Sequence, residues 1–281
     1  MDDDDFDDDN DDEDNDDYEE EEQEWLEEEE VGNVIGIAGM CRLATGEFLL
    51  SDSTNSKIKL LNNTFDIIST IDVPNTTDVC CTGQREAAVG VDDGEDIHEI
   101  LLVRVHAGKI EQKRTIKLQH TCDGLARHGD HIYTTTGTGL YVFDMALGHD
   151  RQLYSDETGE ITVYGCAVSP DGSCIYITNI DHHQFITLNK DGTKLSTLTH
   201  PELKDSQCVH VSPRGHVFVS CTALGSVVQV GIKEDGTQTV TTIAGKNNEL
   251  TAPFSLCFNS SSNTLVVGEY CGNKIVELKL K

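Results

Sequence analysis

The pattern that decides the fold reads Ser169-Pro-Asp-Gly-Ser-Cys-Ile-Tyr-Ile-Thr178, and it returns 43 residues later as Ser212-Pro-Arg-Gly-His-Val-Phe-Val-Ser-Cys221. Both copies begin with a turn, because proline presets φ within the turn and glycine accepts the positive φ that ends it. The β-branched and aromatic residues that follow favour a strand. A third copy of the strand begins at Gly129, again 43 residues away. The chain is therefore built from repeated units.

A second series of turns has nearly the same period. Asp191-Gly-Thr193 and Asp235-Gly-Thr237 lie 44 residues apart. Extending the frame in both directions identifies equivalent strands of the other units at Glu47–Leu50, Ala87–Val91 and Thr264–Val267. Self-similarity with a period of about 20–50 residues is the sequence signature of a repeat architecture.

Each unit has room for further strands. Third strands are expected at Lys57–Leu61, Glu99–Val105, Leu140–Phe143, Phe185–Leu188, Val227–Val230 and Lys274–Leu278, and fourth strands at Ile67–Ile71, Arg114–Leu118, Gln152–Tyr154, Leu195–Leu198 and Thr239–Ile243. Four short strands in about 40–45 residues are typical of a propeller blade. The 251 residues from 31 to 281 accommodate six blades and show no helical periodicity. We predict an all-β, six-bladed β-propeller; five or seven blades are the alternatives.

Charge separates the propeller from what precedes it. Residues 1–30 contain 12 Asp and 10 Glu without Lys or Arg, which is most of the formal net charge of −31. Such a segment cannot bury enough apolar surface to offset its ordering entropy. We therefore predict a disordered acidic tail over 1–30 and the propeller over 31–281. The tail is either a solvating extension or a contact for basic partners.

The last blade lacks a fourth strand, because the sequence ends after its third. Aligning the first unit with the fourth places Trp25 and Leu26 opposite a fourth strand. One hypothesis is that Gln23–Leu26 supplies the missing outer strand of the sixth blade. The alternative is that Trp25 belongs to the tail and the ring closes with a three-stranded blade.

A short motif follows the second strand in two blades. It reads Asp52-Ser-Thr-Asn-Ser-Lys-Ile58 in the first and Glu269-Tyr-Cys-Gly-Asn-Lys-Ile275 in the sixth. Short polar side chains here hydrogen-bond the local backbone and hold the turn, and the isoleucine begins a buried strand. The motif resembles the NHL repeat, although the middle blades have eroded it. The propeller is thus similar to NHL/TolB-like propellers, above all to those that end tripartite-motif (TRIM) proteins, and more distantly to senescence-marker lactonases.

That resemblance implies protein or RNA binding through one face of the propeller. It does not extend to ubiquitin-ligase chemistry, because the sequence has no C-x2-C pair for a RING and no coiled-coil heptads. RNA is the less favoured partner, because the residues after the tail have 29 acidic and 20 basic side chains, and phosphates need a basic face. No cofactor and no metal is expected.

Localisation follows from what the sequence does not show. The N-terminus is acidic rather than basic and apolar, and no apolar run reaches the roughly 18 residues of a membrane span. We expect a cytoplasmic protein without membrane contact. Its ten cysteines are then reduced thiols. Their uneven spacing on the inner strands means that they do not all face the channel, which favours packing over a soft-metal site.

The candidate binding residues lie in the loops that lead into the inner strands, at 75–79, 120–124, 162–165, 204–208 and 251–254. Loops at a channel mouth are where propellers bind their partners. The side chains expected at this rim are Asp78, Asp123, Tyr164, Gln207 and Phe254, and three further candidates, Asn179, His182 and His183, follow the second strand of the fourth blade.

These residues predict a non-catalytic module that binds a protein partner. The alternative from another class is a metal-dependent, lactonase-like hydrolase, for which Asp78 and Asp123 are possible ligands but no third oxygen donor is evident. Rim aspartates more often stabilise turns.

Overall fold

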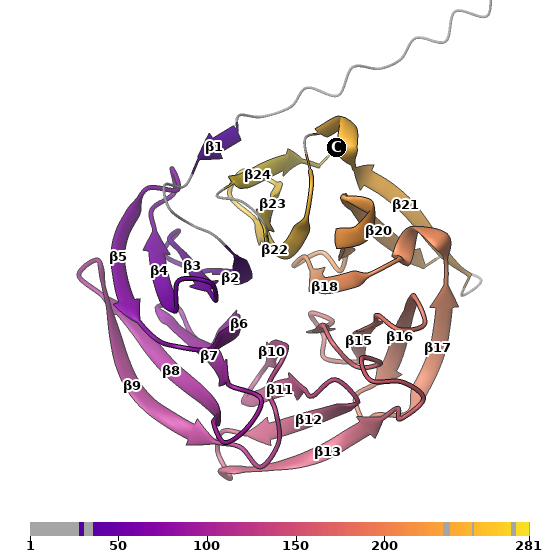
Figure 1. Ribbon diagram of the computed structural model, residues 1–281, viewed down its shortest axis with the longest axis horizontal. Coiled ribbons are helices and arrows are strands. Elements are labelled where there is room, and N and C mark those ends of the chain that lie inside the picture. Colours follow the sequence, from indigo (N-terminus) through magenta and orange to yellow (C-terminus); the bar gives the residue numbers. More distant parts are fainter. Residues whose placement is uncertain (1–27, 31–35, 233–236, 249, 271–273, 281) are drawn as a thin grey trace, which may run out of the picture.

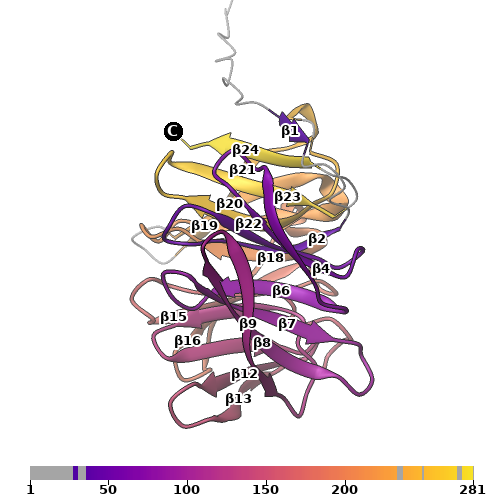
Figure 2. The ribbon, with the colours of Figure 1, turned by 90° about the vertical axis from the view of Figure 1, so that its left-hand side faces the viewer.

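The computed structural model describes residues 28–30, 36–232, 237–248, 250–270 and 274–280, which form a ring of six four-stranded antiparallel sheets (Figure 1). In each sheet the innermost strand comes first and the strands follow outward in chain order, apart from the closing strand of the sixth. The predicted six-bladed β-propeller is confirmed. In the side view the sheets of blades six, one, two and three follow one another around the ring (Figure 2).

The strands of the blades have the following bounds. Blade one consists of β2 (Ile37–Arg42), β3 (Phe48–Asp52), β4 (Lys57–Leu61) and β5 (Ile67–Asp72). Blade two consists of β6 (Thr76–Cys81), β7 (Glu86–Asp92), β8 (His98–His106) and β9 (Lys109–Lys117). Blade three consists of β10 (Leu125–His128), β11 (His131–Thr135), β12 (Gly139–Asp144) and β13 (His149–Ser155). Blade four consists of β14 (Cys166–Val168), β15 (Cys174–Asn179), β16 (Gln184–Asn189) and β17 (Lys194–Thr199). Blade five consists of β18 (Ser206–Val211), β19 (Val217–Cys221), β20 (Ser226–Ile232) and β21 (Gln238–Ala244). Blade six consists of β22 (Pro253–Asn259), β23 (Thr264–Glu269), β24 (Lys274–Lys279) and β1 (Glu28–Glu30).

The repeated turns have the predicted geometry. The Gly172 N–H donates to the carbonyl of Ser169 at 2.9 Å, and the Gly215 N–H donates to that of Ser212 at the same distance. Both glycines have positive φ, 72° and 85°. Every predicted third and fourth strand overlaps an observed one.

The ring closes through a strand from the N-terminal side. Glu28–Glu30 pairs antiparallel with Lys274–Val276 and completes the sixth blade. The sixth blade is thus four-stranded, which corrects the three-stranded alternative, and the sheet includes three residues that the sequence analysis assigned to the tail. The segment Gln23–Leu26, proposed for this role, lies outside the described residues, as does the rest of the predicted tail.

The motif after the second strand holds its turn in blade one. The Asp52 carboxylate accepts from the Asn55 backbone N–H at 3.1 Å and from its side-chain amide at 2.8 Å. In blade six, Glu269 accepts from the N–H and hydroxyl of Thr251, at 2.6 and 2.9 Å, and so fixes the loop before β22. Residues 271–273 of that second copy lie outside the described residues.

The core consists of apolar clusters between successive blades. Phe48 and Leu50 of blade one, for example, share a cluster with Val266 and Ile275 of blade six. The outer strands are far more exposed, and β5 and β17 have no buried side chain. The helices among the described residues are three single 3₁₀ turns, Pro201–Leu203, Thr222–Leu224 and Lys246–Asn248, and none of them is long and apolar enough to cross a membrane.

Candidate functional site

A cavity of about 490 Å³ opens at the end of the central channel where the six inner strands begin. We call it the first cavity. Its lining includes all five side chains that were predicted to meet at the channel mouth, namely Asp78, Asp123, Tyr164, Gln207 and Phe254. They come from blades two to six, one from each. Concave sites of about 300–1,000 Å³ are typical of ligand binding, so this cavity is the candidate functional site.

Hydroxyl groups on the second strands fix the backbone of the cavity residues. Each hydroxyl donates to a carbonyl at the start of the next blade. The bonds run from Thr135 to Tyr164, from Thr178 to Gln207 at 3.1 Å and from Ser220 to Phe254 at 2.7 Å. The same three hydroxyls accept from an inner-strand N–H of their own blade, those of Gly124, Gly165 and Cys208. The second strands therefore position three of the five candidates.

Irregular strand pairing occurs where several residues of the inner strands line the cavity. Register shifts interrupt β2, β6, β18 and β22 near their first residues, as in a β-bulge. Bulges re-aim side chains and are common beside functional sites. The residues at these shifts that line the first cavity are Ala38, Thr77, Asp78, Gln207, Cys208 and Phe254.

Asp78 lines the channel and connects blade two to blade three. Its carboxylate accepts from the Leu125 N–H at 2.8 Å and from the Val79 N–H at 2.7 Å. Gly39 of blade one leaves it room, because a Cβ there would lie 2.4 Å from Asp78 Oδ1. Burial raises the pKa of the Asp78 carboxyl to about 7, although both N–H groups oppose the shift. Backbone donors thus already occupy both oxygens.

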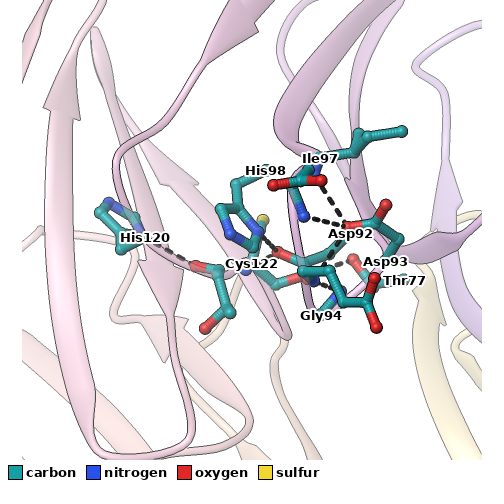
Figure 3. A network of polar contacts seen from close by, with 11 residues as sticks. Thr77, Asp92, Asp93, Gly94, Ile97, His98, His120 and Cys122 are labelled. Atoms are coloured by element: carbon teal, nitrogen blue, oxygen red, sulfur yellow. Dashed lines mark hydrogen bonds and ion pairs between the residues drawn. The ribbon is translucent and has the colours of Figure 1, made fainter.

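Asp123 follows a turn that is anchored to blade two (Figure 3). Asp92 Oδ2 accepts from the Cys122 N–H at 2.7 Å and lies 2.9 Å from His98 Nδ1. The Thr77 hydroxyl donates to the Cys122 carbonyl at 2.8 Å. Burial, and then the charge of Asp92, raise the pKa of the Asp123 carboxyl to about 6. Asp123 is therefore a carboxyl group in the cavity that titrates near neutrality, a common property of functional residues.

Aromatic side chains form another part of the wall. The ring centroids of Phe254 and Tyr270 are 4.9 Å apart, and Tyr270 is 41% exposed. Burial, followed by the charges of Asp123 and Asp78, raises the pKa of Tyr164, so its hydroxyl stays protonated at neutral pH. Sequence reasoning missed Tyr270. Its position beside Phe254 follows from the pairing of Pro253 with Glu269, which no local pattern reveals.

Asp205 is a third carboxylate in the lining that the sequence analysis did not single out, although it lies in the predicted loop 204–208. Its Oδ1 accepts from Gln207 Nε2 at 2.8 Å. Among the described residues, no three His, Cys, Asp or Glu side chains are grouped so that they could hold a metal ion.

The other three candidates lie beside the first cavity and do not line it. Asn179 is fully buried, and its Oδ1 accepts from the His182 N–H at 2.9 Å. His182 is exposed and lies 2.9 Å from the Thr158 hydroxyl through Nε2, whereas His183 has a positive φ of 54°. The intervening Ile180 does line the cavity. These residues shape a rim turn.

The nine described cysteines are free thiols. Cys122, which precedes β10, is fully buried in the cluster between blades two and three and lines neither end of the channel. The cysteines within the inner strands do line the channel, contrary to the expectation from their spacing; they are Cys41, Cys80, Cys81, Cys166, Cys208 and Cys257. Burial raises the pKa of Cys122, Cys80 and Cys166 well above its usual value. At neutral pH these thiols are uncharged packing groups.

Comparison with solved structures shows the same fold in proteins named as lyases. Virginiamycin B lyase from Staphylococcus aureus is 12% identical over 91% of this chain and 99% of its own, with a TM-score of 0.64. A streptogramin B lyase is 13% identical over 91% and 98% of the two chains, with a TM-score of 0.60. A protein of unknown function from Bacteroides thetaiotaomicron is 12% identical over 89% and 71%, with a TM-score of 0.70.

At such identities the likeness shows the fold alone: the chain is a six-bladed propeller protein. No protein-family model and no curated protein matches the sequence. The structures reported above are not tripartite-motif proteins, and the resemblance to NHL repeats stays a prediction.

Proposed function

We propose that the first cavity is a recognition site that takes a cationic side chain of a protein partner. The observation that supports this function is the composition of the lining. It contains the carboxyl groups of Asp78, Asp123 and Asp205, the aromatic pair Phe254 and Tyr270, and no Lys, Arg or His among the described residues. Carboxylates attract an ammonium or guanidinium group, while aromatic faces suit its apolar stem.

A binding role also agrees with the hydrogen bonds of Asp78 and with the exposure of Tyr270. Asp78 accepts a backbone hydrogen bond at each oxygen, so it positions strands and adds negative charge to the cavity. Tyr270 projects from the rim, and half-exposed tyrosines are typical anchors at protein interfaces. The proposed module is therefore non-catalytic and uses the loops at the start of the inner strands.

An immobilised heptapeptide library probed with the purified chain tests this function. We expect the bound peptides to share a Lys or Arg at one position, and its replacement by norleucine to weaken binding about tenfold, as for loss of one charged hydrogen bond. Asp123→Asn and Tyr270→Ala should each weaken binding. Asp191→Asn, which removes the same charge from an exposed turn, is the control, and 0.3 M NaCl screens diffuse attraction by the acidic tail. Binders without a shared cation would refute the proposal.

Affinity should also depend on pH. Above pH 7 both Asp78 (pKa about 7) and Asp123 (pKa about 6) are ionised and attract a cation. As the pH falls from 8 to 5 both carboxyls take up protons, so affinity for a lysine peptide should fall. Asp123→Asn should remove the part of this dependence near pH 6, which titration by fluorescence polarisation will measure.

A second candidate function is acid–base catalysis in the same cavity. The observation in its favour is that Asp123 titrates near neutrality in a concave site, and propellers with this fold include virginiamycin B lyase. Incubation with virginiamycin B and with a simple lactone tests it. Turnover that disappears in Asp123→Asn, with an unchanged melting temperature, would replace the binding function by an enzymatic one.

A further inference from the structure

A second cavity, of about 440 Å³, opens at the opposite end of the channel, where the six inner strands end. The order of residues along each strand shows this: in β6, Thr76 and Thr77 line the first cavity, whereas Val79 to Cys81 line the second. The two cavities meet at a waist formed by Asp78, Cys166, Cys208 and Val209, which line both.

The charge of the second cavity is opposite to that of the first. Arg42 and Arg127 are in its lining, and Asp78 at the waist is the one carboxyl group among the described residues that line it. The partly exposed His210 is neutral, because desolvation lowers its pKa to about 4. In a protein with a formal net charge of −31, this mouth is a local basic site.

Neither arginine is paired with a carboxylate of the described residues. In the described part of the chain, the ion pairs within 4 Å do not involve Arg42 or Arg127. Arg42 Nη2 donates to the Ser261 hydroxyl at 2.8 Å, and its guanidinium carbon lies 5.8 Å from the Phe48 ring centroid. Its Nε is buried without a hydrogen-bond acceptor. Arg42 is partly exposed and has no carboxylate partner among the described residues, so an anionic ligand at its accessible atoms would balance its charge.

The other side chains of the wall are mostly uncharged, and the wall combines apolar and polar surface. Thiols and aliphatic side chains predominate, and they include Met40, Cys41, Leu125, Cys166, Val209 and Leu256. Arg42 and Arg127 share this lining with Cys80 and Cys257. Arg127 is exposed and adds a longer-range attraction at the rim.

We propose that the second cavity binds a small amphiphilic carboxylate, with its apolar body against the thiol wall and its carboxylate on Arg42. A neutral apolar molecule would leave the charge of Arg42 without a counter-ion, and an inorganic anion would leave the aliphatic and thiol part of the wall uncovered. This site is independent of the function proposed for the first cavity.

Titration calorimetry with decanoate tests the proposal, with decanol and decyltrimethylammonium as probes of equal chain length. We expect decanoate to bind at least about tenfold more tightly than decanol, the equivalent of one charged hydrogen bond. Arg42→Met should remove that difference and leave decanol binding unchanged. Arg104→Met, at a surface ion pair with Glu86, is the control and should behave as wild type.

A second measurement uses the unaltered chain and does not depend on the folding of a variant. Cys81 lines the second cavity and is partly exposed, whereas Cys174 is partly exposed and lines neither cavity. Decanoate should slow maleimide labelling of Cys81 and leave Cys174 unaffected. Equal binding of decanoate and decanol, absence of binding, or equal protection of both thiols would overturn the proposal, as would tighter binding of an acidic peptide.

Discussion

Lys57 and Lys59 lie two residues apart in β4 and form ion pairs in opposite surroundings. Lys57 contacts Asp72, whose side chain is 85% exposed, whereas Lys59 Nζ lies 2.6 Å from the carboxylate of Asp52 and both side chains are buried. Solvent screens the first pair, which contributes at most about 1 kcal/mol. Removing one partner of a buried pair leaves an uncompensated charge, which costs about 3–5 kcal/mol.

Asp52→Ala should therefore lower the free energy of unfolding by about 3 kcal/mol or more. It also removes the acceptor for the Asn55 N–H. Asp72→Ala is the matched control, because its partner Lys57 lies in β4 together with Lys59, and it should change stability by less than about 1 kcal/mol. Urea denaturation followed by circular dichroism measures both. Equal effects of the two substitutions would show that the pair at Lys59 is not buried in solution.

The sequence placed Lys57, and not Lys59, in the motif that begins with Asp52. Lys57 is indeed the residue paired with Asp52 across β3 and β4, yet the side chain that reaches the carboxylate is that of Lys59. A local pattern reports strand pairing and turn chemistry. It does not report which lysine is enclosed, because the enclosing surface belongs to other parts of the ring.

Asp78 makes stability depend on pH. Its pKa of about 7 in the folded protein is above the value of roughly 4 for an unfolded chain. The folded state thus binds the proton more tightly, and this contribution to stability is present below about pH 4 and is lost as the pH rises to about 7. Asp78→Asn has no such proton, so the difference in unfolding free energy between wild type and variant should change across pH 4–7. Asp191→Asn is the control; an equal pH profile for all three proteins would contradict the raised pKa.

At the scale of strands, the hydroxyl of Thr178 connects two blades. It accepts from the Gly165 N–H at 2.8 Å and donates to the Gln207 carbonyl at 3.1 Å. Thr178→Val keeps the shape but leaves both backbone groups unpaired, so the free energy of unfolding should fall by about 2 kcal/mol. Thr197→Val on the exposed face of β17 is the control. Urea unfolding will measure both, and a loss below about 0.5 kcal/mol in Thr178→Val would show that the bond contributes little.

The strands and most of the candidate site could be predicted because they depend on local chemistry. Alternating apolar residues and Ser-Pro-X-Gly turns located the blades, and the loops before the inner strands identified five side chains that line one cavity. Asp205 and Tyr270 were missed. Asp205 contacts Gln207, and Tyr270 contacts Phe254, because of turn conformation and strand pairing. The register shifts in β18 and β22 also insert residues into the inner strands, and the sequence period does not predict where these insertions fall.

At the scale of the whole molecule, the six core clusters are equivalent junctions. Each joins two neighbouring blades, and the one between blades six and one differs only in bridging the two ends of the chain. In a linear repeat protein the terminal units need polar caps. In a closed ring no blade is terminal, provided that the last sheet keeps its fourth strand.

The closing strand β1 has only three residues, but it completes the sixth blade and so closes the ring. Glu28–Glu30 pairs with Lys274–Val276 and covers the outer edge of the sixth blade. Glu29→Pro removes a backbone donor at the centre of this strand. We expect the melting temperature to fall by about 2–4 °C for each kcal/mol of pairing lost. Glu19→Pro, which makes the same change within the acidic segment before β1, is the control.

Two truncated chains distinguish the effect of strand pairing on the melting temperature from the effect of the acidic charge. Deletion of residues 1–27 removes 19 carboxylates and keeps β1, so the melting temperature should stay the same or rise as repulsion decreases. Deletion of residues 1–30 removes only three more carboxylates but also the whole strand, and the melting temperature should fall. If both truncated chains melt alike, the sixth blade is stable with three strands, and the ring is closed by the apolar cluster around Phe48 and Ile275 rather than by the strand.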